Sequence, residues 1–225
     1  MTLRTVADLV ETRESWHRVA EHVLAAGQFA AAGTIRLRPY PGGFATAVGV
    51  AGRQLAVVGD RIAIIEGASI RSEQLTTLGR AAEFAGVELG LHGSYTPVTP
   101  VDPDAPLHVD PVAARWLADW FALASVALRR FTEEQGQPME PVLWPEHFDL
   151  GVVLETVNHG FSPGDAAMPE PYLYVGPHEG PPSDHPFWNA SFGASIAISR
   201  IGAEVDAVAF YAQGHRQALE DRSGT

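Results

Sequence analysis

The hydrophobic residues of this chain recur with two different periods, and this alternation constrains the fold more than any other feature of the sequence. Apolar side chains spaced three or four residues apart, as in an amphipathic helix, mark three long segments. They run from Val6 to about Gly27, from Pro111 to Phe131 and from Ala203 to about Leu219. A shorter helix, capped by Ser72 and stopped at Gly86, is predicted between the first two.

Alternating apolar and polar side chains, or short apolar runs, predict strands in other segments. These lie at residues 34–38, 44–50, 54–58, 61–65, 151–154, 170–175 and 194–199. Only Gly59 and Asp60 separate the third run from the fourth, so these two runs are expected to form a hairpin. The sequence therefore predicts an α+β fold, in which a mostly antiparallel sheet or sheets are packed by three or four amphipathic helices.

The 225 residues are expected to form a single compact unit. Residues 90–110 are rich in proline, glycine and serine, so they are expected to form a loop. A boundary between two subdomains, if the chain has one, is expected in this loop. Asp110 and Pro111 at its end form the start signal of the following helix.

Two residue types are missing, and their absence excludes several chemistries. All fifteen basic residues are arginine, so the chain has no lysine for a Schiff base with pyridoxal phosphate or for a nucleotide-binding P-loop. The chain also has no cysteine, which excludes thiol nucleophiles, thiolate-ligated zinc and iron–sulfur clusters. A divalent metal would therefore be held by His, Asp and Glu, a ligand set that suits Zn, Mn or Fe.

The formal net charge of −12 argues against a nucleic acid or an anionic membrane as a partner, because both are bound mainly through clustered basic residues. The N-terminal segment contains acids and lacks an apolar core of signal-peptide length. No apolar run approaches the ~20 residues of a membrane span. We therefore expect a cytoplasmic protein.

One stretch, residues 141–193, combines aromatic, acidic and imidazole side chains more densely than the rest of the chain. No arginine occurs between Phe131 and Ser199, although carboxylates are about as frequent there as elsewhere. A pocket built from this stretch would lack an internal partner for its negative charges. Either a bound cation or exposure to water would relieve the resulting repulsion.

His147 and Asp149 are the first candidates for a catalytic or metal site in this stretch. They stand two residues apart at the entry to an apolar run, so strand periodicity would direct both side chains to the same side. Such a pair can share a divalent metal or a proton, or its members can simply hydrogen-bond each other within the fold. Glu170, on a second expected strand, supplies a further catalytic carboxylate.

The candidates for ligand binding come from the same stretch. Tyr172 and Tyr174 are expected to share one strand face with Glu170. Asp165 ends a segment, residues 158–165, whose glycines and proline predict a turn, and it is expected there as a cap or as a ligand. The remaining candidates for contacts with a small polar molecule are Trp144, Trp188 and Asn189.

Three further patterns have both a functional and a structural interpretation. His17 and Glu21 would share a helix face, either as half of a metal site or as a solvated side-chain contact. Residues 189–193 resemble the nucleophile elbow of serine hydrolases, but Asn189 replaces its first glycine and a strand rather than a helix is expected next. His178 and His185 flank a loop that is either mobile surface or a lid over a site.

Three segments resemble the shared motifs of a family of actinobacterial proteins. They read Trp-Pro-Glu-His-Phe-Asp-Leu at residues 144–150, Ser-Pro-Gly-Asp at 162–165 and Pro-Glu-Pro-Tyr-Leu-Tyr-Val at 169–175. The Pro-Gly-Gly-Phe turn at residues 41–44 is similar as well. The resemblance is close over residues 141–193 and loose over the N-terminal half. It implies a common fold and assigns no activity.

The sequence favours recognition of a small polar molecule in a pocket formed by residues 141–193, with metal-dependent catalysis as one form of that function. His147 would act as acid, base or ligand, Asp149 would orient it or bind the same metal, and Tyr172 would form a wall with Trp144. Two alternatives stay open. One is a binding module that holds a cationic ligand among aromatic rings, and the other is a structural or interaction protein. The sequence does not indicate an oligomeric state.

Overall fold

The computed structural model describes residues 6–223 and confirms an α+β fold of antiparallel strands packed by helices. The chain divides into two compact units, which are described separately. The first unit comprises the chain up to residue 122 together with residues 143–148, and the second comprises residues 123–142 and the chain from residue 149 onward. The loop of residues 90–110 therefore lies within the first unit. Residues 1–5, which contribute to the expectation that the N-terminus is not a signal peptide, lie outside the described residues.

The first unit begins with a long helix that changes type in its middle. α1 (Val6–Val19) passes into a π-helical turn, η1 (Ala20–Ala25), and then into α2 (Ala26–Ala32). The helix runs past Gly27, where the sequence predicted its end. Gly27 has a packing role instead, because a Cβ there would lie 2.5 Å from Cγ1 of Val87.

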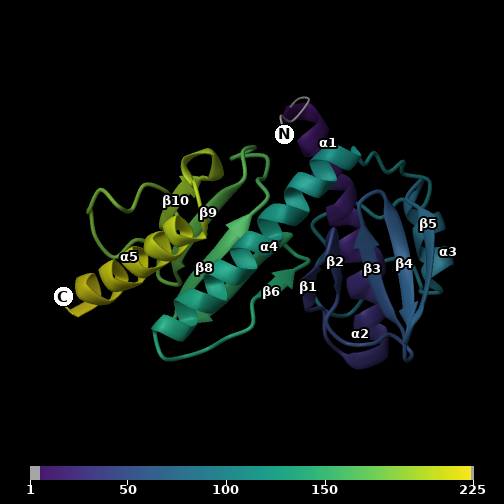
Figure 1. Ribbon diagram of the computed structural model, residues 1–225, viewed down its shortest axis with the longest axis horizontal. Helices are drawn as coiled ribbons and strands as arrows, with labels where there is room; N and C mark the ends of the chain where they lie inside the picture. The colour runs from purple at the N-terminus through teal and green to yellow at the C-terminus, as the bar shows by residue number, and fades with distance from the viewer. Residues whose placement is uncertain (1–5, 224–225) are drawn as a thin grey trace. The chain divides into compact units, whose positions relative to one another are not determined.

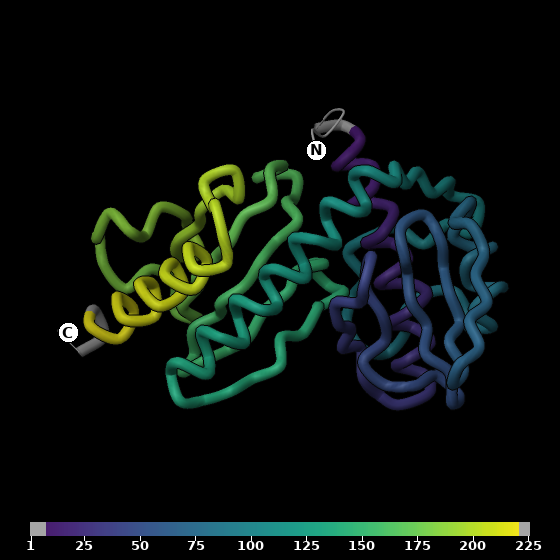
Figure 2. Tube along the Cα trace, viewed as in Figure 1, coloured from purple at the N-terminus to yellow at the C-terminus, as the bar shows by residue number. Residues whose placement is uncertain are grey.

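The strands described in the first unit form an antiparallel sheet. In spatial order they are β6 (Val142–Trp144), β1 (Leu37–Tyr40), β2 (Gly43–Thr46), β3 (Gln54–Val58), β4 (Arg61–Glu66) and β5 (Ser69–Gln74). Figure 2 shows the blue segment of the chain, which carries β1 to β5, folding back on itself between successive strands. The predicted hairpin is confirmed, since Val58 pairs with Arg61 across the turn at Gly59.

β5 contradicts the predicted start of the short helix. Ser72 lies inside β5 and does not cap a helix. The helix α3 (Leu78–Ala85) is capped by the side chain of Thr77 and ends, as predicted, at Gly86 with a φ of 64°. The side chains of β5 are nearly all exposed. The strand therefore carries no apolar alternation by which the sequence would reveal it.

The buried core of the first unit lies between the N-terminal helix and the sheet. Trp16 is fully buried, donates its indole N–H to the carbonyl oxygen of Gly59 at 3.0 Å and packs edge-on against Phe44 at a centroid distance of 5.5 Å. Further fully buried apolar side chains are Val19, Val23, Leu24, Leu55 and Ile62. Burial of this apolar area, at about 25 cal/mol per Å², is the main force that holds helix and sheet together.

The helix α4 (Pro111–Glu134) starts at the predicted signal. Oδ1 of Asp110 accepts the amides of Val112 and Ala113, each at 2.9 Å, which satisfies donors that have no partner inside the helix. Residues 111–122 of this helix belong to the first unit and the remainder to the second.

The strands of the second unit follow one another as an antiparallel meander. They are β7 (Asp149–Leu154), β8 (Val157–Ser162), β9 (Tyr172–Pro177) and β10 (Ala194–Ala197). Glu155 and Thr156 form the turn between β7 and β8 with positive φ angles of 50° and 67°, as in the tight hairpin turns that match the twist of a sheet.

β8 replaces the turn that the sequence predicted at residues 158–165. Gly160 explains the error, because a Cβ there would lie 2.5 Å from the carbonyl oxygen of Leu150 and from the ring of Tyr174. A glycine inside a strand often marks such a close approach. Gly160 leaves space for the ring of Tyr174 and does not form a turn.

Helices pack against one face of the second unit's sheet. Phe131 of α4 and Tyr211 of α5 (Glu204–Ser223) approach His159 of β8 with ring centroids 4.6 Å and 6.2 Å away. Figure 1 shows both helices crossing in front of these strands.

α5 forms close to the predicted place. Two of its apolar side chains, Val205 and Leu219, are 56% and 36% exposed. The buried positions include Ala207, Tyr211 and His215. No helix of the described residues is both long enough and apolar enough to cross a membrane.

Candidate functional site

His147 and Asp149 do not lie on one strand. Residues 145–148 form a turn, and Phe148 has a φ of 52°, so the strand alternation that would align the two side chains is absent. His147 is exposed in the first unit, whereas Asp149 opens β7 of the second. The strand extends only from Asp149, so strand alternation does not place the two side chains on one face.

The side chain of Phe148 accounts for this turn. It is fully enclosed, with ring centroids 5.3 Å from Phe44 and 5.6 Å from Phe121, and it stacks on His17 at 5.4 Å. A left-handed backbone at a non-glycine residue costs about 1 kcal/mol, which the burial of a phenyl ring, at about 2 kcal/mol, offsets. Trp144, just before the turn, is half-buried beneath the guanidinium of Arg36, at 5.7 Å from its ring centroid.

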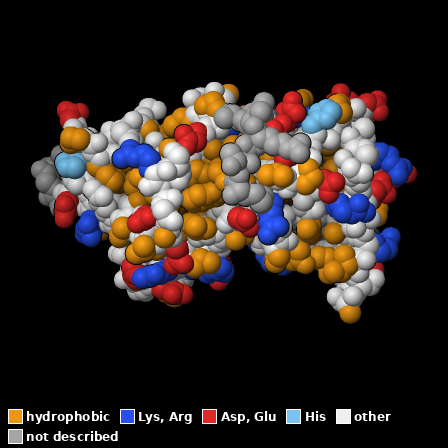
Figure 3. Space-filling model, turned by 45° about the horizontal axis from the view of Figure 1, so that its top comes forward, with side chains coloured by type: hydrophobic (Ala, Val, Ile, Leu, Met, Phe, Trp, Pro, Cys, Tyr) orange, Lys and Arg blue, Asp and Glu red, His pale blue; other side chains and the backbone are white. Residues whose placement is uncertain are grey.

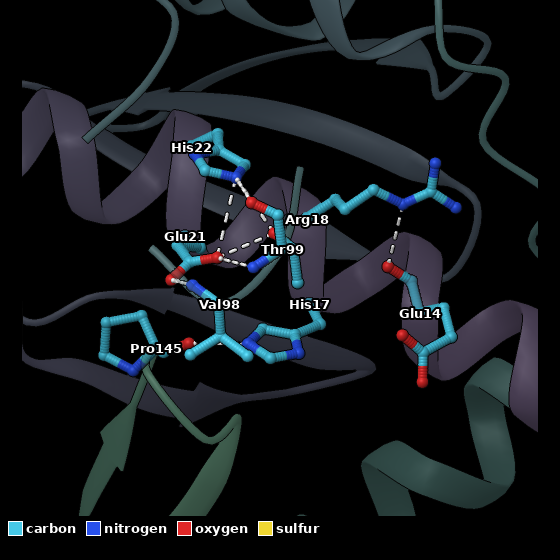
Figure 4. A network of polar contacts seen from close by, with 8 residues as sticks. All are labelled: Glu14, His17, Arg18, Glu21, His22, Val98, Thr99 and Pro145. Atoms are coloured by element: carbon cyan, nitrogen blue, oxygen red, sulfur yellow. Dashed lines mark hydrogen bonds and ion pairs between the residues drawn. The ribbon is translucent and has the colours of Figure 1, made fainter. Parts of the chain in front are cut away.

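A buried polar network surrounds Glu21 in the π-helical turn of the first unit (Figure 4). Oε1 accepts the amide of Val98 at 2.9 Å, and Oε2 accepts the amide and the hydroxyl of Thr99 at 2.9 Å and 2.6 Å. Burial alone would raise the pKa of Glu21, but the hydrogen bonds from Thr99 and Val98 prevail and lower it. Glu21 is thus an ionised, fully buried anchor for the segment around residues 98–99.

His22, the next residue, reaches the same segment. Its Nε2 lies 2.9 Å from both the carbonyl and the hydroxyl oxygen of Thr99 and 3.5 Å from Oε2 of Glu21. A regular α-helix separates consecutive side chains by about 100°. The wider π-helical turn accompanies the convergence of both side chains on Thr99.

Two further side chains lie beside this network. The hydroxyl of Tyr95 is buried, and burial, together with the charge of Glu21, raises its pKa above the ordinary range. Nε2 of His17 lies 2.8 Å from the carbonyl oxygen of Pro145. Burial lowers the pKa of His17, although the charges of Glu21 and Glu14 act in the opposite direction.

These contacts correct the interpretation of His17 and Glu21 as a solvated pair. Glu21 is fully buried and bonds Val98 and Thr99, whereas His17 bonds the turn at Pro145. Both oxygens of Glu21 already accept hydrogen bonds, two of them from main-chain amides. The arrangement holds a loop in place and leaves little capacity for chemistry on a substrate.

The first unit also contains a cavity of about 320 Å³ near the start of α4. Its lining includes the carboxylates Asp8, Glu11, Asp60 and Asp110, together with His108. Asp110 is committed to capping α4. This strongly polar lining differs from the mostly apolar walls of typical small-molecule sites.

The sheet of the second unit has a polar face on the side opposite His159, here named the tyrosine face. Gly160 pairs with Gly151 on one side and with Tyr174 on the other, and Ser162 pairs with Tyr172. Because side chains two residues apart share a face, these positions lie on one side of the sheet. The face comprises Asp149, Gly151, Gly160, Ser162, Tyr172, Tyr174 and Ser195.

Tyr174 and Asp149 form the centre of this face. The hydroxyl of Tyr174 donates to Oδ2 of Asp149. The ring of Tyr174 passes over Gly160, and a Cβ at Gly151 would lie 3.1 Å from the hydroxyl oxygen, so the two glycines create the space that the phenol occupies. Burial raises the pKa of Tyr174 well above its ordinary value, and the charge of Asp149 adds to the shift.

Tyr172 makes a second phenol–carboxylate contact. Its hydroxyl donates to Oδ2 of Asp165 at 3.0 Å. Oδ1 of Asp165 accepts the amides of Ala167 and Met168 at 2.7 Å and 2.8 Å, so Asp165 has the expected role in a turn as well. Burial raises the pKa of Tyr172 to about 12, and the charge of Asp165 contributes to the increase.

Phe192 completes an aromatic group with these tyrosines. Its centroid lies 6.3 Å from that of Tyr172 and 6.4 Å from that of Tyr174, and the two tyrosine centroids are 6.3 Å apart. Sequence reasoning missed Phe192. It lies in the loop before β10, and only the pairing of β10 with β9 brings that loop to the tyrosine face.

The other predicted residues do not join this group through the contacts described. Glu170 is exposed and precedes β9, which begins at Tyr172 rather than at Glu170. Trp188 is half-buried and packs edge-on against Phe187 at 5.0 Å. The side-chain amide of Asn189 bonds the main chain of Ser195 twice, at 2.8 Å and 2.9 Å, which is a structural role at the start of β10.

Two buried histidines that the sequence did not single out, His159 of β8 and His215 of α5, lie on the opposite, helix-covered side of the sheet. His159 and His215 have centroids 5.2 Å apart, and His159 also packs against Phe131. Neither ring nitrogen of His159 has a hydrogen-bond partner at bonding distance. Burial and the neighbouring His215 lower the pKa of His159 to about 3, so its ring is neutral at physiological pH.

Charges of both signs are interspersed on the surface drawn in Figure 3, where the arginines do not gather into a single patch. In the second unit Arg129 pairs with Glu140 at 3.1 Å, and Arg130 pairs with Glu134 at 3.0 Å and Glu204 at 3.5 Å. Exposed ion pairs of this kind are worth about 0 to 1 kcal/mol.

Within the described residues, no group of three or more His, Cys, Asp and Glu side chains is arranged to hold a metal ion. A metal shared by His147 and Asp149 therefore stays a prediction. Comparison with known protein families, with curated proteins and with solved structures gives no match. The resemblance to an actinobacterial family stays a prediction.

Proposed function

We propose that the second unit recognises a small polar molecule on its tyrosine face. The observation that carries the proposal is the hydrogen-bonded pair of Tyr174 and Asp149, which stands over a strip of sheet where Gly151 and Gly160 supply no side chains. A phenol can donate and accept, and a carboxylate can accept several hydrogen bonds. The pair therefore offers polar groups of fixed direction to a ligand.

The surroundings of this pair resemble those of small-molecule sites, which combine aromatic walls with a few oriented polar groups. The rings of Tyr172 and Phe192 adjoin Tyr174 and supply the walls. Because the pKa of Tyr172 is raised to about 12, its hydroxyl stays protonated at physiological pH and remains a donor. The proposal needs neither a metal nor the catalytic role predicted for His147.

As part of this proposal, the partner is a small molecule rather than a nucleic acid. The net charge of −12 supports this choice, because binding to a phosphate backbone depends on clustered basic residues.

A ligand-observed NMR screen of polar fragments tests the proposal. We expect fragments that bind the wild-type protein to bind the double variant Asp149→Asn, Tyr174→Phe much more weakly, so that most of the NMR effect caused by binding is lost. The matched control is Tyr40→Phe, which removes a phenol hydroxyl from a half-buried tyrosine of the first unit and should leave binding unchanged. Fragments that bind the double variant as well as the wild type, or no binding at all, would contradict the proposal.

A further inference from the structure

We propose that the molecule recognised on the tyrosine face carries an ammonium or guanidinium group. The inference rests on the proposed function and specifies the chemistry of its ligand. It follows from three features of the second unit: a carboxylate at the centre of the face, aromatic rings beside it, and the absence of basic residues from the segment that forms the face.

The first two features form the surroundings that organic cations favour. Asp149 supplies a negative charge at the phenol of Tyr174. Tyr172, Tyr174 and Phe192 adjoin one another in pairs with centroids 6.3 to 6.4 Å apart. The faces of aromatic rings attract cations, and rings grouped beside a carboxylate bind ammonium and guanidinium groups through both effects.

The third feature is that the segment which supplies the side chains of this face contains no basic residue of its own. It has no lysine, and no arginine occurs between Phe131 and Ser199. The ion pairs of Arg129 and Arg130 are made with Glu140, Glu134 and Glu204, carboxylates that do not belong to the tyrosine face. A cation from outside would therefore meet an acidic and aromatic surface without competition from these two arginines.

The same features disfavour an anionic ligand. The carboxylates Asp149 and Asp165 both accept phenol hydroxyls at this face, so an anion would be repelled while competing for the same donors. A neutral polar molecule can use the hydrogen bonds but gains nothing from the charge or from the rings. Comparison of a cation with a neutral molecule of the same shape therefore separates the possibilities.

The test is a titration of the isotope-labelled full chain, followed by amide NMR, with two matched pairs of probes. The cations are methylguanidinium and tetramethylammonium, and their neutral counterparts are N-methylurea and tert-butanol. Ionic strength is held constant with sodium chloride. We expect each cation to bind at least about tenfold more tightly than its neutral counterpart and to shift amides of β7, β8 and β9.

Asp149→Asn is the decisive variant, because asparagine keeps an oxygen that can accept from Tyr174 while it loses the charge. We expect it to weaken the binding of both cations about tenfold and to leave the neutral probes unchanged. Glu133→Gln, at an exposed carboxylate of α4, is the control and should have little effect.

The outcomes distinguish the inference from the proposed function. If neutral or anionic fragments bind the tyrosine face and the cations bind no better, the inference is overturned while the proposed function stands. If no molecule of any charge binds this face, both are overturned. Thermal melting followed by circular dichroism checks that Asp149→Asn folds. If its melting is not cooperative, Phe192→Leu tests the contribution of the aromatic rings to cation binding with the charge of Asp149 intact.

Discussion

Glu21 and Asp149 are both carboxylates that accept a hydrogen bond from a hydroxyl group, but their surroundings in the two units differ. Glu21 is fully buried and accepts two main-chain amides as well as the hydroxyl of Thr99. Asp149 is half-buried at the start of a strand and accepts the phenol of Tyr174. The main-chain donors of Glu21 belong to the loop that it holds, whereas the contact of Asp149 with Tyr174 joins two side chains of neighbouring strands. The first arrangement suits an anchor and the second suits recognition.

The largest expected effect is that of Glu21→Ala on stability. The variant leaves the amides of Val98 and Thr99 without their acceptor, and we expect the free energy of unfolding to fall by about 3 kcal/mol. Urea denaturation followed by circular dichroism measures the change. Glu88→Ala, at an exposed carboxylate of the same unit, should change stability by less than about 0.5 kcal/mol. Equal losses of stability in the two variants would show that Glu21 contributes no more to the fold than an exposed carboxylate does.

The second expected effect is on stability at low pH, and it comes from the buried, neutral ring of His159. The pKa of His159 is lowered to about 3 from 6.5, so the folded state disfavours the protonated ring. The contribution of the neutral ring to the free energy of unfolding is complete above about pH 6.5. It declines as pH falls towards 3, by about 1.4 kcal/mol for each pH unit.

Urea denaturation at pH 6.5 and pH 5 checks this slope. We expect His159→Phe to be less acid-sensitive than the wild type by up to about 2 kcal/mol over this interval. His178→Phe, at an exposed histidine of the same unit, should retain the wild-type slope. An unchanged slope in His159→Phe would show that acid acts through other groups.

The smallest stability effect is expected for Asp149→Asn. The asparagine oxygen can still accept from Tyr174, so we expect a loss below about 1 kcal/mol in the same urea measurement. A loss larger than that of Glu21→Ala would reverse the comparison and make Asp149 the stronger structural anchor.

Local signals in the sequence were sufficient for several parts of the fold. Asp110 before Pro111, Gly86 after α3 and Gly59 between β3 and β4 act through backbone geometry within a few residues, and the predicted helix start, helix end and hairpin are present. β5 and β8 were missed for different reasons. One strand has almost no buried side chain, and the other contains Gly160 for the sake of a ring from the neighbouring strand.

The candidate site was predictable as a set of residues but not as an arrangement. The density of acids and aromatics identified Asp149, Asp165, Tyr172 and Tyr174. Their pairing depends on the register of β7, β8 and β9, which no short segment encodes. The sequence suggested a pair of His147 and Asp149 because it does not reveal the turn between them. That turn accompanies the burial of Phe148, which depends on residues far away in the sequence.

The most direct test of this account is NMR of the protein with isotope-labelled tyrosine ring carbons, recorded during a titration with methylguanidinium. The chain has five tyrosines, and Tyr95 beside Glu21 serves as the internal reference for the anchor. The account predicts that the signals of Tyr172 and Tyr174 shift with saturation while that of Tyr95 stays in place. A saturable shift of Tyr95 with unmoved signals from Tyr172 and Tyr174 would contradict it.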